Sequence, residues 1–210
     1  MNFQKKPTKV LILLTIERTG STWLSDAIRC HPAIDYWSTA IVCQSLQLAK
    51  FRRYPTDLSN TSEATREIEV STDKWEKIPD FSPLDNFPEL PTYSDSDVYA
   101  IEKIHPHFFE FDPLFLLDNI LELENLGIEI KIIYLIRESQ AAITSFLNYQ
   151  KRNPNWNKGL QNEKLISYTI KQYQSILKLA KYKEGLILDY ADIKQDLRKV
   201  LLDIYEHLWP

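Results

Sequence analysis

The sequence lacks an excess of positive charge, a long apolar run and a framework of cysteines. Its 25 Lys and Arg residues are outnumbered by 29 Asp and Glu residues. Nucleic-acid binders are usually basic, so we expect no nucleic-acid partner. The apolar run after Lys9 spans only about five residues, too few for a signal peptide or a membrane span. Two cysteines, Cys30 and Cys43, are too few for a disulfide or metal framework, which favours reduced thiols, a cytoplasmic location and no metal.

The remaining composition is that of one ordinary globular domain. Hydrophobic residues make up 44% and charged residues 26% of the 210 positions. We expect a single domain over residues 1–210. Residues 54–97 differ from the rest, because they are rich in Pro, Ser, Thr and Asp and contain scattered aromatic residues. Long segments of this kind are usually functional, so we predict an irregular insertion or lid there.

Apolar runs alternate with amphipathic stretches along the chain. The runs predict strands at residues 10–15, 98–104, 128–136 and 185–190. The stretches predict helices at residues 21–30, 36–51, 113–126, 141–150, 162–182 and 193–208. This alternation predicts an α/β fold, a three-layer sandwich in which helices flank a central parallel sheet.

Local signals mark several helix boundaries and helix faces. Asp112 and Pro113 predict a capped helix start, Gly127 predicts its end, and Ser139 predicts the next cap. In the first helix, the spacing predicts one common face for Trp23, Leu24, Ala27 and Ile28. In the helix at 162–182, it predicts an apolar face that consists of Leu165, Ile166, Tyr173, Ile176, Leu177 and Ala180.

The turn between the first strand and the first helix resembles a phosphate loop without its lysine. A Walker loop has Gly-Lys followed by Ser or Thr, whereas Ser21 follows Gly20 here. Gly20 allows a close approach of the backbone to an anion, and Ser21 and Thr22 add hydroxyl groups. The nearby cation is Arg18. The turn therefore predicts an anion site, since ligands of parallel sheets bind beyond the carboxyl ends of the strands.

Two further strands end in residues that suit the same site. The segment KIIYLIRESQAAITSF places Arg137 at a strand end and Ser145 in the following helix, where both can contact a phosphate. The segment VYAIEKIH places His105 at another strand end. Histidine has a pKa suited to proton transfer near neutrality, which makes His105 a candidate base.

These segments resemble the sulfotransferases that use 3′-phosphoadenosine 5′-phosphosulfate (PAPS). Residues 18–24, RTGSTWL, resemble their 5′-phosphosulfate loop, and Arg137 with Ser145 resembles their 3′-phosphate site. The resemblance implies a P-loop-like fold and donor contacts from Arg18, Thr19, Gly20, Ser21, Thr22 and Trp23, with Trp23 against the adenine. Tyr190, in GLILDY, resembles a late residue near the nucleotide. The implied reaction transfers a sulfuryl group from PAPS to the hydroxyl of a carbohydrate, lipid, phenol or similar acceptor, with 3′-phosphoadenosine 5′-phosphate (PAP) as product.

The resemblance also implies catalytic roles. Lys103-Ile104-His105 is similar to the Lys-x-His of cytosolic members, in which the histidine is the base and the lysine assists at the sulfuryl group. Arg18, typical of Golgi members, would stabilise the leaving phosphate; His107 and Asp35 are alternative bases. The Arg-Lys-Gly segment of cytosolic members has no counterpart here, which predicts a lower PAPS affinity. A kinase-like phosphoryl-transfer enzyme and a noncatalytic PAPS- or PAP-binding protein are the alternative functions, and the acceptor and oligomeric state stay open.

Overall fold

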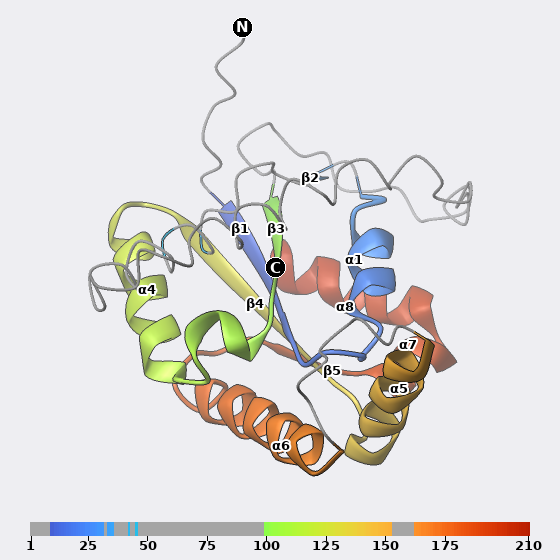
Figure 1. Ribbon diagram of the computed structural model, residues 1–210. Helices are drawn as coiled ribbons and strands as arrows, with labels where there is room; N and C mark the ends of the chain where they lie inside the picture. The colour runs from blue at the N-terminus through green and yellow to red at the C-terminus, as the bar shows by residue number, and fades with distance from the viewer. Residues whose placement is uncertain (1–8, 32, 36–41, 43–44, 46–98, 153–161) are drawn as a thin grey trace, which may run out of the picture.

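The fold is a parallel α/β sandwich, as the sequence predicted (Figure 1). The computed structural model describes residues 9–31, 33–35, 42, 45, 99–152 and 162–210. In these residues a five-stranded sheet has the order β2-β3-β1-β4-β5, and all neighbouring strands are parallel. Its strands are β1 (Lys9–Thr15), β2 (Ile34–Asp35), β3 (Tyr99–Ile104), β4 (Glu129–Ile136) and β5 (Leu186–Asp189).

Helices cover both faces of this sheet (Figure 1). The described α-helices are α1 (Ser21–Ile28), α4 (Pro113–Asn125), α5 (Ser139–Arg152), α6 (Asn162–Leu179), α7 (Tyr190–Gln195) and α8 (Leu197–Leu208). A short 3-10 helix, η4 (Pro106–Phe109), follows β3. Helices α4, α5 and α6 supply core residues on one face, and α1, α7 and α8 supply core residues on the other.

The central strand β1 explains the two cores. Val10, Ile12 and Leu14 belong to the core under α4 and α6, whereas Leu11 and Leu13 belong to the core under α1 and α8. Side chains alternate between the faces of a strand, so a strand buried on both sides needs an unbroken apolar run. All five side chains have no exposed surface.

Two of the predicted helix boundaries near α4 are confirmed, and one at α5 is wrong. The Asp112 side chain accepts a hydrogen bond from the Leu114 amide at 3.1 Å, and Gly127 follows α4 with φ of +84°. Ser139 is the first residue of α5 rather than its cap. The carboxylate of Glu138 instead accepts from the amides of Gln140 at 2.7 Å and Ala141 at 2.6 Å. An ionised side chain is favoured there by the partial positive charge of the helix N-terminus.

The helix predicted at residues 193–208 is in fact two helices. Asp196 separates α7 from α8, and its side chain accepts a hydrogen bond from the Lys199 amide at 3.0 Å. A short polar side chain that caps a new helix competes with continuation of the old one. Tyr190, predicted as the last strand residue, is the first residue of α7.

The predicted buried face of α1 is wrong at one position. Leu24 and Ile28 have no exposed surface, whereas Trp23 keeps 36% of its surface exposed. The helix places Trp23 outside the core because the α1 stripe that faces the sheet runs through Ser21, Leu24 and Ile28. The indole is therefore left on the molecular surface next to the loop.

The predicted buried face of α6 is also wrong in part. Ile166 and Leu177 are 46% and 54% exposed, while the polar residues Thr169, Gln172 and Ser175 are buried. Two of these side chains donate hydrogen bonds to backbone carbonyls. Thr169 donates to the Leu165 carbonyl one turn earlier in α6, and Ser175 donates to the Phe111 carbonyl. The buried side of α6 thus carries hydrogen-bonded polar residues beside its buried apolar residues Leu165, Ile176 and Leu179.

Some predictions fall outside the described residues. The insertion at 54–97 and Cys43 lie there, and of the helix predicted at 36–51 only residues 42 and 45 are described. Cys30 is a free thiol. Among the described helices, none is both long and apolar enough to cross a membrane.

Candidate active site

The turn after β1 presents a tightly built loop at the carboxyl end of the sheet. Gly20 precedes α1 in the left-handed conformation, with φ of +79°, and Arg18 is left-handed as well, with φ of +66°. A Cβ on Gly20 would lie 2.3 Å from the Tyr190 ring. Glycine is therefore required at this position both for the backbone angle and for the contact with Tyr190.

Buried threonines hold the loop from within. The Thr19 hydroxyl donates to the Ile16 carbonyl at 2.9 Å and also contacts the Thr15 hydroxyl. Thr19 was predicted to contact the donor, but its hydroxyl is engaged inside the loop, which leaves its backbone for such a contact. Ser21 is also buried, whereas Thr22 is exposed.

Lys103 joins the end of β3 to this loop. Its ammonium group donates to the Thr22 hydroxyl at 3.0 Å. Burial lowers the pKa of Lys103, and the nearby Asp26 carboxylate opposes this shift. The fold thus brings the lysine next to the Thr22 hydroxyl, although the two residues are eighty-one positions apart in the sequence.

His105 directly follows β3, and its ring lies beside Thr15, the last residue of β1. Its Nδ1 is 3.0 Å from the carbonyl oxygen of Thr15. A carbonyl only accepts, so Nδ1 carries the proton and Nε2 keeps its lone pair. Burial chiefly, with His107 and Lys103 also acting, lowers the pKa of His105 to about 3, while the bond to Thr15 opposes the shift. The imidazole is therefore neutral near pH 7, which is the protonation state that a base requires.

Arg137 connects the end of β4 to the loop. Its Nη1 donates to the Arg18 carbonyl at 2.8 Å, and its guanidinium lies 4.6 Å from the centre of the Tyr190 ring. The Arg18 guanidinium lies 4.2 Å from the centre of the Tyr149 ring on α5. Cation–π contacts and hydrogen bonds hold two arginine side chains in defined positions beside the loop. Tyr173 of α6 donates to the Arg137 carbonyl.

A cavity of about 550 Å³ opens beside these arginines along α5. It is lined by Arg18, Arg137, Glu138, Gln140, Ala141, Thr144, Ser145, Asn148, Tyr149 and Arg152. Three of the predicted donor-binding residues therefore face one cavity, namely Arg18, Arg137 and Ser145. Tyr190 is next to the cavity through its contact with Arg137, and Trp23 is on the surface of α1.

Sequence reasoning missed a polar network on the other side of the loop. The Glu17 carboxylate accepts from the Tyr168 hydroxyl at 3.1 Å and from the Gln172 amide group at 3.2 Å, and it is 3.6 Å from His107 Nδ1. Burial raises the pKa of Glu17, and these two hydrogen bonds oppose the shift. The buried polar residues of α6 carried the signal, since an amphipathic helix places polar residues on its buried face only where they find partners.

The alternative bases occupy different positions. The His107 ring stacks near the His105 ring, with 5.7 Å between the ring centres, and His107 takes part in the Glu17 network. Asp35 belongs to the edge strand β2, which pairs with β3 at the opposite end from His105. Within the described residues, no cluster of His, Cys, Asp and Glu has the arrangement of a metal site.

The parallel sheet and the loop after β1 define an α/β protein with a P-loop-like fold. A family model for the sulfotransferase domain matches residues 7–208. The chain therefore belongs to the sulfotransferase-domain family, and this membership confirms the resemblance found in the sequence. No curated protein matches the sequence.

Solved structures agree with this fold. A mouse sulfotransferase, SULT7A1, complexed with PAP, has a TM-score of 0.53 at 16% identity, covering 98% of this chain and 60% of the mouse chain. A sulfotransferase from Alicyclobacillus acidocaldarius has a TM-score of 0.56 at 10% identity, covering 98% and 81%. The sulfotransferase domain of the Synechococcus PCC 7002 olefin synthase has a TM-score of 0.52 at 22% identity, covering 98% and 74%. The chain thus spans less than two thirds of the mouse enzyme.

Proposed function

We propose that this chain transfers a sulfuryl group from PAPS to the hydroxyl of an acceptor molecule. The observation that carries the proposal is the convergence of Arg18, Arg137 and Ser145 on one cavity beside the Gly20 loop. Family membership supports sulfuryl transfer, and the mouse relative complexed with PAP supports the choice of donor. A small-molecule, glycan or lipid acceptor and a cytoplasmic location are part of the same proposal.

The loop residues fit a phosphosulfate. Gly20 allows close backbone approach, and the amides at the start of α1 favour an anion. Within the described part of the chain, the Arg18 Nε is a buried donor without a hydrogen-bond partner. A buried donor left without a partner destabilises the protein by about 1–3 kcal/mol, so a bound anion that accepts from it gains affinity.

The 3′-phosphate is assigned to Arg137 and Ser145. Arg137 holds the Arg18 carbonyl with one amino group, and its forked guanidinium retains further donors for phosphate oxygens. Ser145 faces the same cavity from the second turn of α5. Trp23, exposed beside the loop, is available to stack on the adenine.

His105 acts as the base in this mechanism. Its Nε2 accepts the proton of the acceptor hydroxyl while the acceptor oxygen bonds to sulfur. The bond between sulfur and the bridging phosphate oxygen breaks, and PAP leaves with that oxygen. Lys103, which contacts Thr22, and Arg18, which belongs to the loop, stabilise the charge that grows on the bridging oxygen.

The two alternative functions make different predictions. A kinase-like enzyme would bind ATP through a Walker lysine, and Ser21 stands at that position. A noncatalytic protein would bind PAP without turnover. His107 and Asp35 remain the alternatives to His105 as base.

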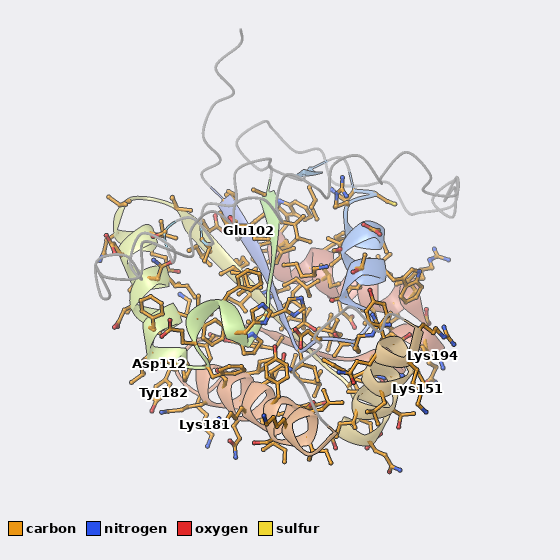
Figure 2. The ribbon with its side chains drawn as sticks, in the orientation of Figure 1. Glu102, Asp112, Lys151, Lys181, Tyr182 and Lys194 are labelled. Carbon is orange, nitrogen blue, oxygen red and sulfur yellow. The ribbon has the colours of Figure 1, made fainter. Side chains whose placement is uncertain are left out.

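Calorimetry with PAP, ATP and AMP tests the donor. We expect PAP to bind most tightly, and preference for ATP would refute the proposal. Arg137→Ala should weaken PAP binding by about 10- to 100-fold, because a charge-assisted contact is lost, and should affect AMP far less. Lys181→Ala is the charge-matched control, since Lys181 is exposed and lies beyond the end of α6 (Figure 2).

A transfer assay with sulfur-labelled PAPS tests the base. Screening sugars, phenols and lipids should identify an acceptor for the unmodified protein. His105→Ala should then abolish turnover while PAP affinity stays within about twofold, because a base acts on the barrier rather than on donor binding. Retained turnover in this variant would assign the base to His107 or Asp35, and absence of transfer with every acceptor would favour the noncatalytic function.

A further inference from the structure

We propose that Arg152, the last residue of α5, is a further donor-binding residue that contacts the 3′-phosphate together with Arg137 and Ser145. The inference rests on the proposed function, because it requires a nucleotide that carries a 3′-phosphate. It starts from the cavity, whose lining includes both ends of α5, from Glu138 beside its first residue to Arg152 at its last.

The spacing along α5 places Arg152 on the face that carries Ser145. Tyr149 follows Ser145 by one helical turn, and Arg152 follows by two, so all three line the cavity. Seven residues correspond to about 10 Å along the helix axis. Helical side chains lean toward the N-terminus, so a side chain as long as that of Arg152 can reach back over the turn that carries Tyr149 toward Ser145.

The first turn of α5 does not bind the phosphate itself. A helix N-terminus is usually a ready anion site, but the Glu138 carboxylate already accepts from the amides of Gln140 and Ala141. An incoming phosphate would meet this negative charge. We therefore place the phosphate farther along α5, where the lining side chains are Thr144, Ser145 and Asn148 and the next cation is Arg152.

The two other arginines of the cavity are already anchored. Arg137 is tied to the Arg18 carbonyl and lies over Tyr190, and Arg18 lies over Tyr149. They form a fixed wall on one side, whereas Arg152 is exposed at the other end of the cavity. Binding of a phosphate dianion between them orders the Arg152 side chain, and a charge-assisted, forked contact offsets the lost side-chain entropy.

The neighbouring residue Lys151 supplies a matched control. It has the same charge, is exposed and lies in the same last turn of α5, but it does not line the cavity (Figure 2). Both residues interact favourably with the C-terminal end of the helix dipole. Any effect of lost helix stability or lost overall charge should therefore appear equally in Lys151→Ala and Arg152→Ala.

The experiment measures the affinities of PAP and AMP for the unmodified protein, Arg152→Ala, Arg152→Lys and Lys151→Ala by calorimetry at one salt concentration. We expect Arg152→Ala to weaken PAP binding by about 10-fold or more and AMP binding by less than about twofold, as for loss of one charge-assisted phosphate contact. Arg152→Lys should recover part of the PAP affinity, because it keeps the charge but not the fork. Circular dichroism should show equal helicity in all four proteins.

The outcomes separate this inference from the proposed function. If the unmodified protein prefers PAP over AMP but Arg152→Ala behaves as Lys151→Ala, the inference is wrong and the proposed donor stands. Equal losses for PAP and AMP in Arg152→Ala would also refute a contact with the 3′-phosphate. If the unmodified protein does not distinguish PAP from AMP, both the proposed function and the inference fail.

Discussion

Substitution of Gly20 by alanine tests the packing of the loop against Tyr190. An alanine in the left-handed conformation costs about 1–2 kcal/mol, and Gly20 has φ of +79°. The new Cβ would also lie 2.3 Å from Tyr190 Cε2, which forces the ring or the loop to move. Overpacking of this kind costs about 1–3 kcal/mol, so the combined loss of stability is about 2–5 kcal/mol.

Gly127→Ala provides the matched control, because Gly127 has φ of +84° but no atom within 4 Å of its added Cβ. Gly127→Ala should lose only the stability that the left-handed backbone angle costs an alanine, about 1–2 kcal/mol. Urea denaturation of both variants, and of Gly20→Ala combined with Tyr190→Ala, measures the difference. In the double variant, the absence of the Tyr190 ring should remove the loss of stability that overpacking causes in Gly20→Ala. Equal destabilisation by Gly20→Ala and Gly127→Ala would show that Tyr190 does not restrict the loop.

Four further predictions concern His105, Tyr168, Trp23 and Leu24. The pKa of His105 in the folded protein, about 3, lies below its ordinary value of 6.5. Between pH 3 and pH 6.5, this imidazole is therefore protonated in the unfolded state but neutral in the folded state. The stability that His105 contributes should thus be complete above pH 6.5 and decline toward pH 3, and His105→Gln should flatten this slope in denaturation titrations. Tyr168→Phe should cost about 1 kcal/mol in urea denaturation, because Glu17 loses a donor. Trp23→Ala should cost about 1–2 kcal/mol of stability, because the indole is only partly buried, and should also weaken PAP binding. Buried Leu24→Ala should cost about 2–5 kcal/mol in the same assay.

The sheet was predictable because burial on both faces leaves a simple pattern. Residues 10–14 of β1 are apolar at every position, and residues 132–136 of β4 form a similar run, so both strands were identified with boundaries near the observed ones. The cap at Asp112 was also local, since its side chain bonds to an amide two residues later. Short-range rules apply where partners are close in the sequence.

The sequence was less informative where a partner is distant. Gln172 is buried in α6 because it bonds to Glu17, which is 155 positions away. Trp23 appeared to continue the apolar stripe of α1, and only the sheet position decides that Leu24 faces inward. At α5, the sequence predicted Ser139 as the cap, but the side chain of the preceding residue, Glu138, accepts from the helix amides instead. Helical spacing leaves such choices to tertiary contacts.

The low pKa of His105 bears on when the base is effective. Burial and the neighbouring cation Lys103 both disfavour an imidazolium at this position. A bound phosphosulfate would bring negative charge to the loop that Lys103 already contacts, and nearby negative charge raises the pKa of a histidine. Under the proposed mechanism, His105 is then a weak base in the free protein and a stronger one in the donor complex. Proton transfer from the acceptor is thereby coupled to donor binding, because the imidazole becomes more basic only when the donor is bound.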